Sequence, residues 1–245
     1  YNEYMELGLR YPPMFTRVST TEEAMVTLQT TNIDLVICMP GTADNDAFSV
    51  ARSIKQAFKN IPCVVLTPFS HGITKRMKNE DLRMFDYVFC WLGNTNLILS
   101  IIKLIEDKMN IAHDIRESGV QMILLVEDSI RFYSSILPNL YSYILAQSKR
   151  FSTEALNKHQ ATLRMRGRPK VVLARTYEEA MTIYNQFSDN CLGVICDARF
   201  PMKETSADEN DKLPSPLRDT DVYKDPEAGL KLLRAIRAKD EYVPL

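Results

Sequence analysis

The sequence has 245 residues, 45% of them hydrophobic and 25% charged, with a formal net charge of −1. This length suits two ordinary globular domains, and the near-neutral charge argues against a broad nucleic-acid surface, so we expect no nucleic-acid partner. The longest apolar stretches are too short or too interrupted by charge to span a bilayer, and the N-terminus has no signal-peptide pattern, so we expect a cytoplasmic protein without a membrane segment.

The first half of the chain alternates strand-like and helical patterns, which is typical of an α/β sheet with crossover helices. Continuous or alternating apolar runs predict four strands: "MFTRVS" (14–19), "IDLVICM" (33–39), "IPCVVLT" (61–67) and "FDYVFCW" (85–91). Amphipathic segments predict three helices between and after them: "TTEEAMVTLQTT" (20–31), "AFSVARSIKQAFKN" (47–60) and "NLILSIIKLIEDKMN" (96–110).

The second half repeats this alternation after a hinge expected at 111–119. The predicted strands are "QMILLVED" (121–128), "KVVLART" (170–176) and "LGVICD" (192–197). The predicted helices are one from Ile130 to about Gln160, "EEAMTIYNQF" (178–187) and "PEAGLKLLRAIRAKD" (226–240). A helix of ~30 residues is roughly 45 Å long. The far half of this long helix must therefore pack on something outside its own sheet.

The two halves are copies of one pattern. "TEEAM" at 21–25 lines up with "YEEAM" at 177–181, an offset of 156, and "VIC" at 36–38 lines up with "VIC" at 194–196, an offset of 158. Farther on, the matching residues lie 182 apart, so the second copy contains 24 extra residues. They fall between Asp197 and Gly229, and we predict the polar segment 202–224 in this interval to be an inserted loop. By this alignment the first copy lacks its first strand, and the second stops where its fourth strand begins.

Acidic residues follow two strands of the second copy. Glu127 and Asp128 end its first strand and Asp197 ends its third. These strands are neighbours in a sheet of flavodoxin-like order 2-1-3-4-5, so the three carboxylates should converge at the carboxyl edge, where ligands bind. Three negative charges so close together repel one another unless a cation neutralises them. Mg²⁺ suits such a site, because all of the ligands are oxygen atoms. A bound Mg²⁺ can orient a phosphoryl donor toward Asp197, which makes Asp197 a candidate nucleophile. The alternative is that these acids are simply solvated at a strand end.

This combination of "ILLVEDS", "GVICD" and an R-x-P turn resembles the receiver domain of two-component response regulators. The resemblance implies a doubly wound, flavodoxin-like (CheY-like) fold for both copies. It implies that Asp197 is the phosphoacceptor, that Glu127 and Asp128 bind Mg²⁺ with it, and that the backbone carbonyl of Arg199 completes the metal site. The partner implied is a histidine kinase or another phosphodonor. The switch hydroxyl and conserved Lys of this family would lie beyond Leu245 in the second copy.

The first copy departs from the receiver pattern. Met39 stands at the phosphoacceptor position and Cys90 at the position of the family's Lys, while Thr67 matches the switch hydroxyl. A thioether cannot accept a phosphoryl group. We therefore expect residues 1–110 to form a pseudo-receiver and 120–245 to form the receiver-like domain.

A wider resemblance covers "ILLVEDSIRFYSSILPNLYSYI", "KHQATLRMRGRPKVVLARTYEEA" and "DPEAGLKLLRAIR". These segments are similar to the N-terminal regulatory region of bacterial phosphoenolpyruvate synthase-like proteins. The resemblance implies that this region is non-catalytic and that a catalytic domain of the same chain is a partner. The alternative function is thus a non-phosphorylated allosteric or interaction module. The neighbouring pseudo-receiver, a second subunit in a homodimer and the catalytic portion remain alternatives for what the long helix contacts.

A DNA-binding regulator is the weakest alternative. "RMRGRPK" (164–170) contains an "RGRP" core of the kind that enters minor grooves, but a Gly-Pro turn leading into a strand also explains it.

Overall fold

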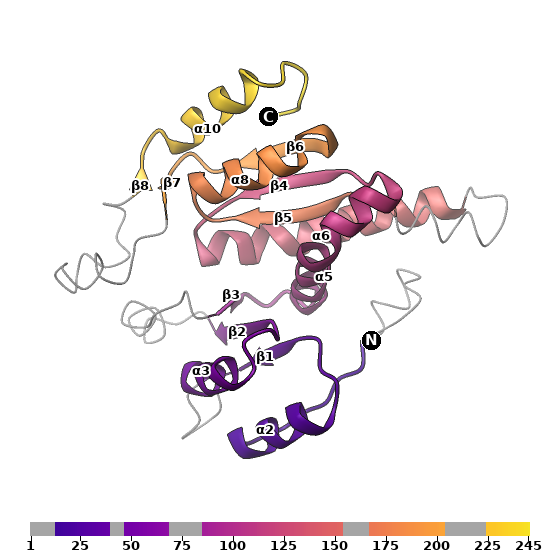
Figure 1. Cartoon of the computed structure of the whole chain (residues 1–245), viewed down its shortest axis with the longest axis vertical. Coiled ribbons are helices and arrows are strands. Elements are labelled where there is room, and N and C mark those ends of the chain that lie inside the picture. Colours follow the sequence, from indigo (N-terminus) through magenta and orange to yellow (C-terminus); the bar gives the residue numbers. More distant parts are fainter. Residues whose placement is uncertain (1–12, 40–46, 69–84, 154–166, 204–223) are drawn as a thin grey trace. The chain divides into compact units, whose positions relative to one another are not determined.

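The computed structural model describes residues 13–39, 47–68, 85–153, 167–203 and 224–245 (Figure 1). The chain divides into two compact units, 1–102 and 103–245. Each unit contains a parallel β-sheet with helices, as expected for an α/β protein. Within the described part of the chain, no helix has the length and apolar character needed to cross a membrane.

The first unit contains a parallel sheet in the order β1-β2-β3. Its strands are short and apolar, and β2 and β3 are buried almost throughout. The elements are α2 (Thr21–Thr30), β1 (Val36–Cys38), α3 (Ala47–Ala57), β2 (Cys63–Pro68), β3 (Tyr87–Trp91) and the start of α5 (Asn96–Ser118). Three of the four predicted strands are confirmed.

The strand predicted at 14–19 is wrong. Residues 13–18 form no strand, and Met14 and Phe15 are exposed. The corresponding strand of the second unit, β5 (Lys170–Ala174), pairs only with β4 (Met122–Val126). The described residues of the first unit contain no counterpart of β4. Without that partner, the alternating pattern of "MFTRVS" has no sheet to join.

The second unit contains a parallel sheet in the order β5-β4-β6, so its first strand is central. Its other elements follow in chain order: α6 (Ile130–Thr153), α8 (Tyr177–Phe187), η2 (Ser188–Asn190), β6 (Cys191–Cys196), β7 (Phe200–Pro201), β8 (Lys224–Asp225) and α10 (Ala228–Arg237). The order matches the predicted placement of the first and third strands side by side. At the outer edge of β6, the backbone N–H of Val194 donates to the carbonyl of Pro244 at 2.9 Å.

The main core of the second unit lies between one face of this sheet and the helices α8 and α10. Alternate residues of β4 point into it, and Tyr184 of α8 and Leu232 of α10 close it from the other side. Figure 1 shows α6 on the opposite side of the strands from α8. Both faces of the central strand are therefore covered, which explains why β4 is apolar along its whole length.

The two units repeat one helix start in atomic detail. The Thr20 side chain accepts a hydrogen bond from the Glu23 N–H at 3.1 Å, and the Thr176 side chain accepts one from the Glu179 N–H at the same distance. In each case the Glu carboxylate accepts from the N–H one residue before the cap. These are capping boxes, so the sequence repeat at offset 156 is also a structural repeat.

The segment predicted as a hinge, 111–119, is helical as far as Ser118. Ile111 is buried in the core of the second unit and Ile115 packs against that core, which accounts for the longer helix. The helix ends at Gly119, whose φ of 58° suits a residue without a side chain. The predicted long helix is confirmed from Ile130 to Thr153, and its predicted remainder lies outside the described residues.

A buried ion pair joins α5 to the start of β5. Asp107 is fully buried, and Arg168 binds its two carboxylate oxygens at 3.0 and 2.6 Å. The Tyr141 hydroxyl and the Val171 N–H each donate to the same carboxylate at 3.0 Å. Arg168 belongs to the "RGRP" core, so this arginine is committed to the interior of the unit.

Candidate metal centre

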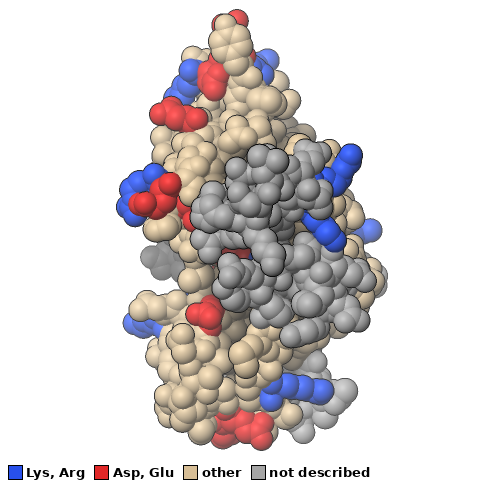
Figure 2. Space-filling view, turned by 90° about the vertical axis from the view of Figure 1, so that its right-hand side faces the viewer, with Lys and Arg blue, Asp and Glu red and all other residues tan. Residues whose placement is uncertain are grey.

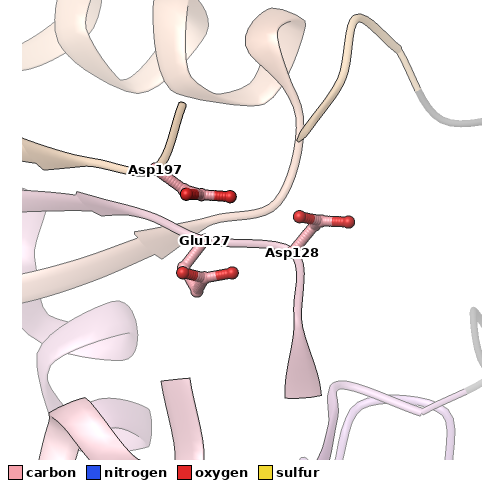
Figure 3. Close-up of side chains that lie close together, drawn as sticks. All are labelled: Glu127, Asp128 and Asp197. Atoms are coloured by element: carbon pink, nitrogen blue, oxygen red, sulfur yellow. The ribbon is translucent and has the colours of Figure 1, made fainter. Parts of the chain in front are cut away.

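Three carboxylates meet at the carboxyl edge of the second sheet. Glu127 and Asp128 directly follow β4, and Asp197 directly follows the neighbouring strand β6. One oxygen of each lies within 4.8 Å of one oxygen of each of the others. Figure 3 shows the three side chains gathered at these strand ends. The predicted convergence of these acids is therefore present in the structure.

The backbone of the sheet fixes the position of two of these acids. The Asp197 N–H donates to the carbonyl of Val126 at 2.9 Å, and the Glu127 N–H donates to the carbonyl of Ala174 at 3.0 Å. These bonds extend the parallel ladders beyond the last strand residues. The Glu127 carboxylate also accepts from the Ser129 N–H at 2.9 Å. The backbone of Glu127 and of Asp197 is thus hydrogen-bonded to the sheet directly beyond the strand ends.

Packing of α10 against its backbone holds Asp197 in place. A side chain at Gly229 would lie only 2.3 Å from the Asp197 carbonyl oxygen, and the Gly229 N–H donates to the carbonyl of Ala198 at 3.1 Å. The first turn of α10 therefore lies directly on the backbone that carries Asp197. Only glycine permits this close approach.

The cluster is electrostatically strained. Burial raises the pKa of Glu127 to about 7; the nearby charges of Asp197 and Asp128 add to the effect, and the Ser129 N–H opposes it. Burial also raises the pKa of Asp128 above its usual range, although the Lys224 ammonium opposes it. A cation at this place would relieve both effects.

Lys224 supplies one positive charge. Its Nζ lies 2.8 Å from Oδ2 of Asp128, and the two side chains are 22% and 14% exposed. The other oxygen of Asp128, Oδ1, is buried and has no hydrogen-bond partner among the residues that the structure describes. In the described part of the site the Lys224 ammonium thus pairs with one of the three carboxylates, and a buried acceptor there stays unsatisfied, which is a costly arrangement.

The donor set fits a hard divalent cation. Glu127, Asp128 and Asp197 offer carboxylate oxygens, which Mg²⁺ and Ca²⁺ prefer. The neighbouring Cys196 does not change this character. Burial, followed by the charges of Asp197 and Glu127, raises the pKa of its thiol to about 12, so the sulfur stays protonated near neutral pH. Among the residues that the structure describes, this is the one group of three or more metal-ligating side chains so close together.

The fourth predicted ligand stays a prediction. Arg199 lies two residues beyond Asp197, between β6 and β7, and its side chain is exposed. The predicted insertion 202–224 lies mostly outside the described residues, but its two ends are described. The chain directly before the insertion and the chain at its end pair as the antiparallel strands β7 and β8, with Pro201 opposite Lys224.

The sequence patterns did not predict that Lys224 lies at the site. It lies 27 positions after Asp197, beyond the insertion, and no periodic pattern connects the two residues. The pairing of β7 with β8 brings Lys224 back to the acidic edge. The one usable signal is the position of this lysine directly before "DPEAG", where the chain enters α10 beside the strand ends.

The equivalent edge of the first unit is different in chemistry. Met39 follows β1 and is 62% exposed. Thr67 and Cys90 lie opposite each other at the ends of β2 and β3, and both are buried, with 3.9 Å between Thr67 Oγ1 and Cys90 Sγ. In the described part of this edge, apolar, hydroxyl and thiol groups replace the carboxylates.

Charged side chains do not segregate on the face shown in Figure 2. Lys and Arg are interspersed with Asp and Glu over the described residues of that face. The arginine at the centre of "RGRP" is buried against Asp107, as described above. The surface shown therefore lacks the uniform basic stripe that typifies nucleic-acid-binding proteins.

Comparison with known proteins does not assign the chain to a family. No protein-family model matches it, and no curated protein is significantly similar to it. Its function has to be argued from the site.

Proposed function

We propose that residues 120–245, within the second unit, form a receiver-like domain of flavodoxin-like fold in which Asp197 accepts a phosphoryl group with the help of Mg²⁺. The observation that carries this proposal is the meeting of Glu127, Asp128 and Asp197 at the ends of adjacent parallel strands. The strand order β5-β4-β6, with the first strand in the centre, supports the flavodoxin-like fold.

The proposed reaction is transfer of a phosphoryl group to a carboxylate. An oxygen of Asp197 forms a bond to phosphorus, and the bond between phosphorus and the donor's leaving group breaks, with the electron pair going to the leaving group. The product is an acyl phosphate on Asp197. Asp197 suits this role because it is partly exposed, whereas Glu127 is buried.

The other two acids have a different task. Glu127 and Asp128, with the Arg199 carbonyl as a further proposed ligand, would hold Mg²⁺ beside Asp197. When bound, Mg²⁺ supplies the positive charge that allows three carboxylates and a phosphoryl group to share one site. The buried Oδ1 of Asp128 supports this assignment, since it is an acceptor without a donor among the described residues.

The first unit would act as a pseudo-receiver. Exposed Met39 at its strand end supports a role in packing or partner contact rather than phosphorylation. In this proposal a histidine kinase or another phosphodonor serves Asp197. The output would reach a catalytic domain of the same chain, as in phosphoenolpyruvate synthase-like proteins, or a second copy of the chain.

The test is phosphorylation by a small phosphodonor such as acetyl phosphate. With Mg²⁺ present, intact-mass measurement should show one added phosphoryl group that hydroxylamine removes, as expected for an acyl phosphate. Asp197→Asn should show none. Asp189→Asn, which changes an exposed aspartate of η2, should behave as wild type. Equal labelling of the wild type and Asp197→Asn would refute the assignment.

A second function remains, and the ion pair between Lys224 and Asp128 favours it. A site whose aspartate already has an ammonium partner can be a purely structural junction in an allosteric or interaction module without phosphorylation. In that case Asp197→Asn should leave the binding of a partner protein unchanged, whereas Lys224→Met, which breaks the ion pair with Asp128, should weaken it.

A further inference from the structure

The acidic cluster already contains a cation that belongs to the chain. Lys224 Nζ lies 2.8 Å from Asp128 Oδ2, and both side chains are largely buried. A Lys side chain pays a desolvation cost when it is buried, and three nearby carboxylates offset that cost. The ammonium therefore neutralises part of the negative charge that a metal ion would neutralise.

The ammonium is held by a short, well-anchored ribbon. Lys224 and Asp225 form β8, which pairs with Phe200 and Pro201 of β7. Phe200 is fully buried in the core, and the carbonyl of Met202, just beyond β7, accepts from the Glu178 N–H at 3.0 Å. These contacts place the ribbon, and with it Lys224, beside the strand ends.

The residue after Lys224 is tied to α10. The Asp225 carboxylate accepts from the Glu227 N–H at 2.8 Å and binds Lys231 at 2.5 Å. The first turn of α10 in turn lies on the backbone of Asp197 through Gly229. Two consecutive residues, Lys224 and Asp225, therefore join the acidic cluster to the start of α10.

We propose that Lys224 is a tethered counter-ion that competes with the divalent cation for Asp128, so that metal binding displaces its ammonium and shifts β8 together with the first turn of α10. The inference rests on the proposed metal site and goes beyond it, because it assigns a role to a residue that is not a ligand. Lys224 would lower the affinity for the metal and transmit metal binding to α10.

Charge explains why the ammonium and the metal compete. A divalent ion bound to the cluster has to use an oxygen of Asp128, and a second positive charge within a few ångströms of it is repelled. Removal of Lys224 both vacates Oδ2 and makes the cluster more negative. Both effects increase metal affinity. A residue that merely supports the shape of the site would have the opposite effect when removed.

The test is Mg²⁺ titration by calorimetry of the wild type, Lys224→Met, Lys224→Arg and Lys203→Met. Lys203 is an exposed lysine at the other end of the same insertion, so its replacement is the matched control for loss of one positive charge. We expect Lys224→Met to bind Mg²⁺ at least about tenfold more tightly than the wild type. Lys224→Arg and Lys203→Met should stay within about threefold of it.

Amide hydrogen exchange gives a second readout. Mg²⁺ should change exchange at residues 225–231 in the wild type, whereas metal-free Lys224→Met should already exchange there like the metal-bound wild type. This readout does not depend on phosphorylation. It also reports whether each variant is folded, through the core strands β4 and β5.

The outcomes separate the two proposals. Tighter binding by Lys224→Met, or binding by this variant alone, supports the counter-ion role. Binding that is unchanged or weaker in folded Lys224→Met overturns the counter-ion role and leaves the metal site intact. Absence of Mg²⁺ binding in all variants overturns the metal site, and the counter-ion role with it.

Discussion

The carbonyl oxygen of Asp197 lies where a side chain at Gly229 would have to be, with only 2.3 Å between that oxygen and a Cβ at residue 229. The contact is between backbone and backbone, so no side-chain rotation can relieve a substitution. The start of α10 and the proposed phosphoacceptor are therefore coupled by contact.

Gly229→Ala should destabilise the second unit and weaken its metal site. We expect the free energy of unfolding to fall by about 1–3 kcal/mol, as for other overpacked positions, because α10 or Asp197 has to move. Chemical denaturation measures the loss, and Mg²⁺ titration measures the effect on the site. Leu230→Ala, at an exposed position of the same helix, should change stability by less than about 0.5 kcal/mol. If Gly229→Ala matched Leu230→Ala, the close packing of α10 on Asp197 would be wrong.

Glu127→Gln should stabilise the metal-free protein at high pH. The folded-state pKa of Glu127 is raised to about 7, so the folded protein holds this proton more tightly than the unfolded chain does. Stability then falls as pH rises from the usual carboxyl range through about 7, and below that range the group contributes nothing. The free energy of unfolding of Glu127→Gln should exceed that of the wild type by on the order of 2 kcal/mol at pH 8, with little difference at pH 4.

Thermal unfolding of both proteins in a chelator, at a series of pH values, measures this difference. Glu178→Gln, on the first turn of α8, is the control and should show no such dependence on pH. A constant difference between Glu127→Gln and wild type at all pH values would contradict the raised pKa.

Asp107→Asn should strongly destabilise the second unit, although Asp107 is far in sequence from the strand ends that carry the acidic cluster. It leaves the buried guanidinium of Arg168 without its charged partner, and loss of one member of such a pair costs about 3–5 kcal/mol. The free energy of unfolding lost by the double variant Asp107→Asn, Arg168→Met should be smaller than the sum of the losses in the two single variants. Glu106→Gln removes the pair between the buried Lys103 and the more exposed Glu106, and it should cost less than Asp107→Asn because one partner still reaches solvent. Additive losses in the double variant would mean that the two residues do not interact.

Thr176→Ala should destabilise α8 by about 1 kcal/mol, because it removes the side chain that caps the Glu179 N–H. Thr182→Ala is the control on the exposed face of the same helix and should be neutral or slightly stabilising, since alanine is the better helix former. Unfolding by denaturant compares the two. Equal effects at the two positions would show that the cap contributes nothing.

Much of the candidate site could be predicted because it depends on local sequence. A continuous apolar strand followed by an acid places that acid at the carboxyl edge, and the expected flavodoxin-like strand order makes the strands before Glu127, Asp128 and Asp197 neighbours. The parallel strands of both units follow from the same patterns. The helix predicted at 178–187 matches α8 to within one residue.

The rest depends on contacts between distant segments. Lys224 reaches Asp128 only because two short strands pair across the insertion, and two-residue strands leave no periodic signal. The role of Asp107 was hidden because an isolated acid within an amphipathic helix usually faces solvent. The pattern of "MFTRVS" predicted a strand, but a strand needs a partner as well as a pattern.

The measurement that tests the central claim most directly is Mg²⁺ binding by the wild type, Asp197→Asn and Asp189→Asn, followed by NMR chemical shifts with and without beryllofluoride. The account predicts saturable Mg²⁺ binding in the wild type and Asp189→Asn, with shifts at Glu127, Asp128 and Asp197, and a further change when beryllofluoride is added. Asp197→Asn should bind Mg²⁺ at least about tenfold more weakly and should not respond to beryllofluoride. Equal responses of the wild type and Asp197→Asn, or no response in either, would contradict a phosphoacceptor site at Asp197.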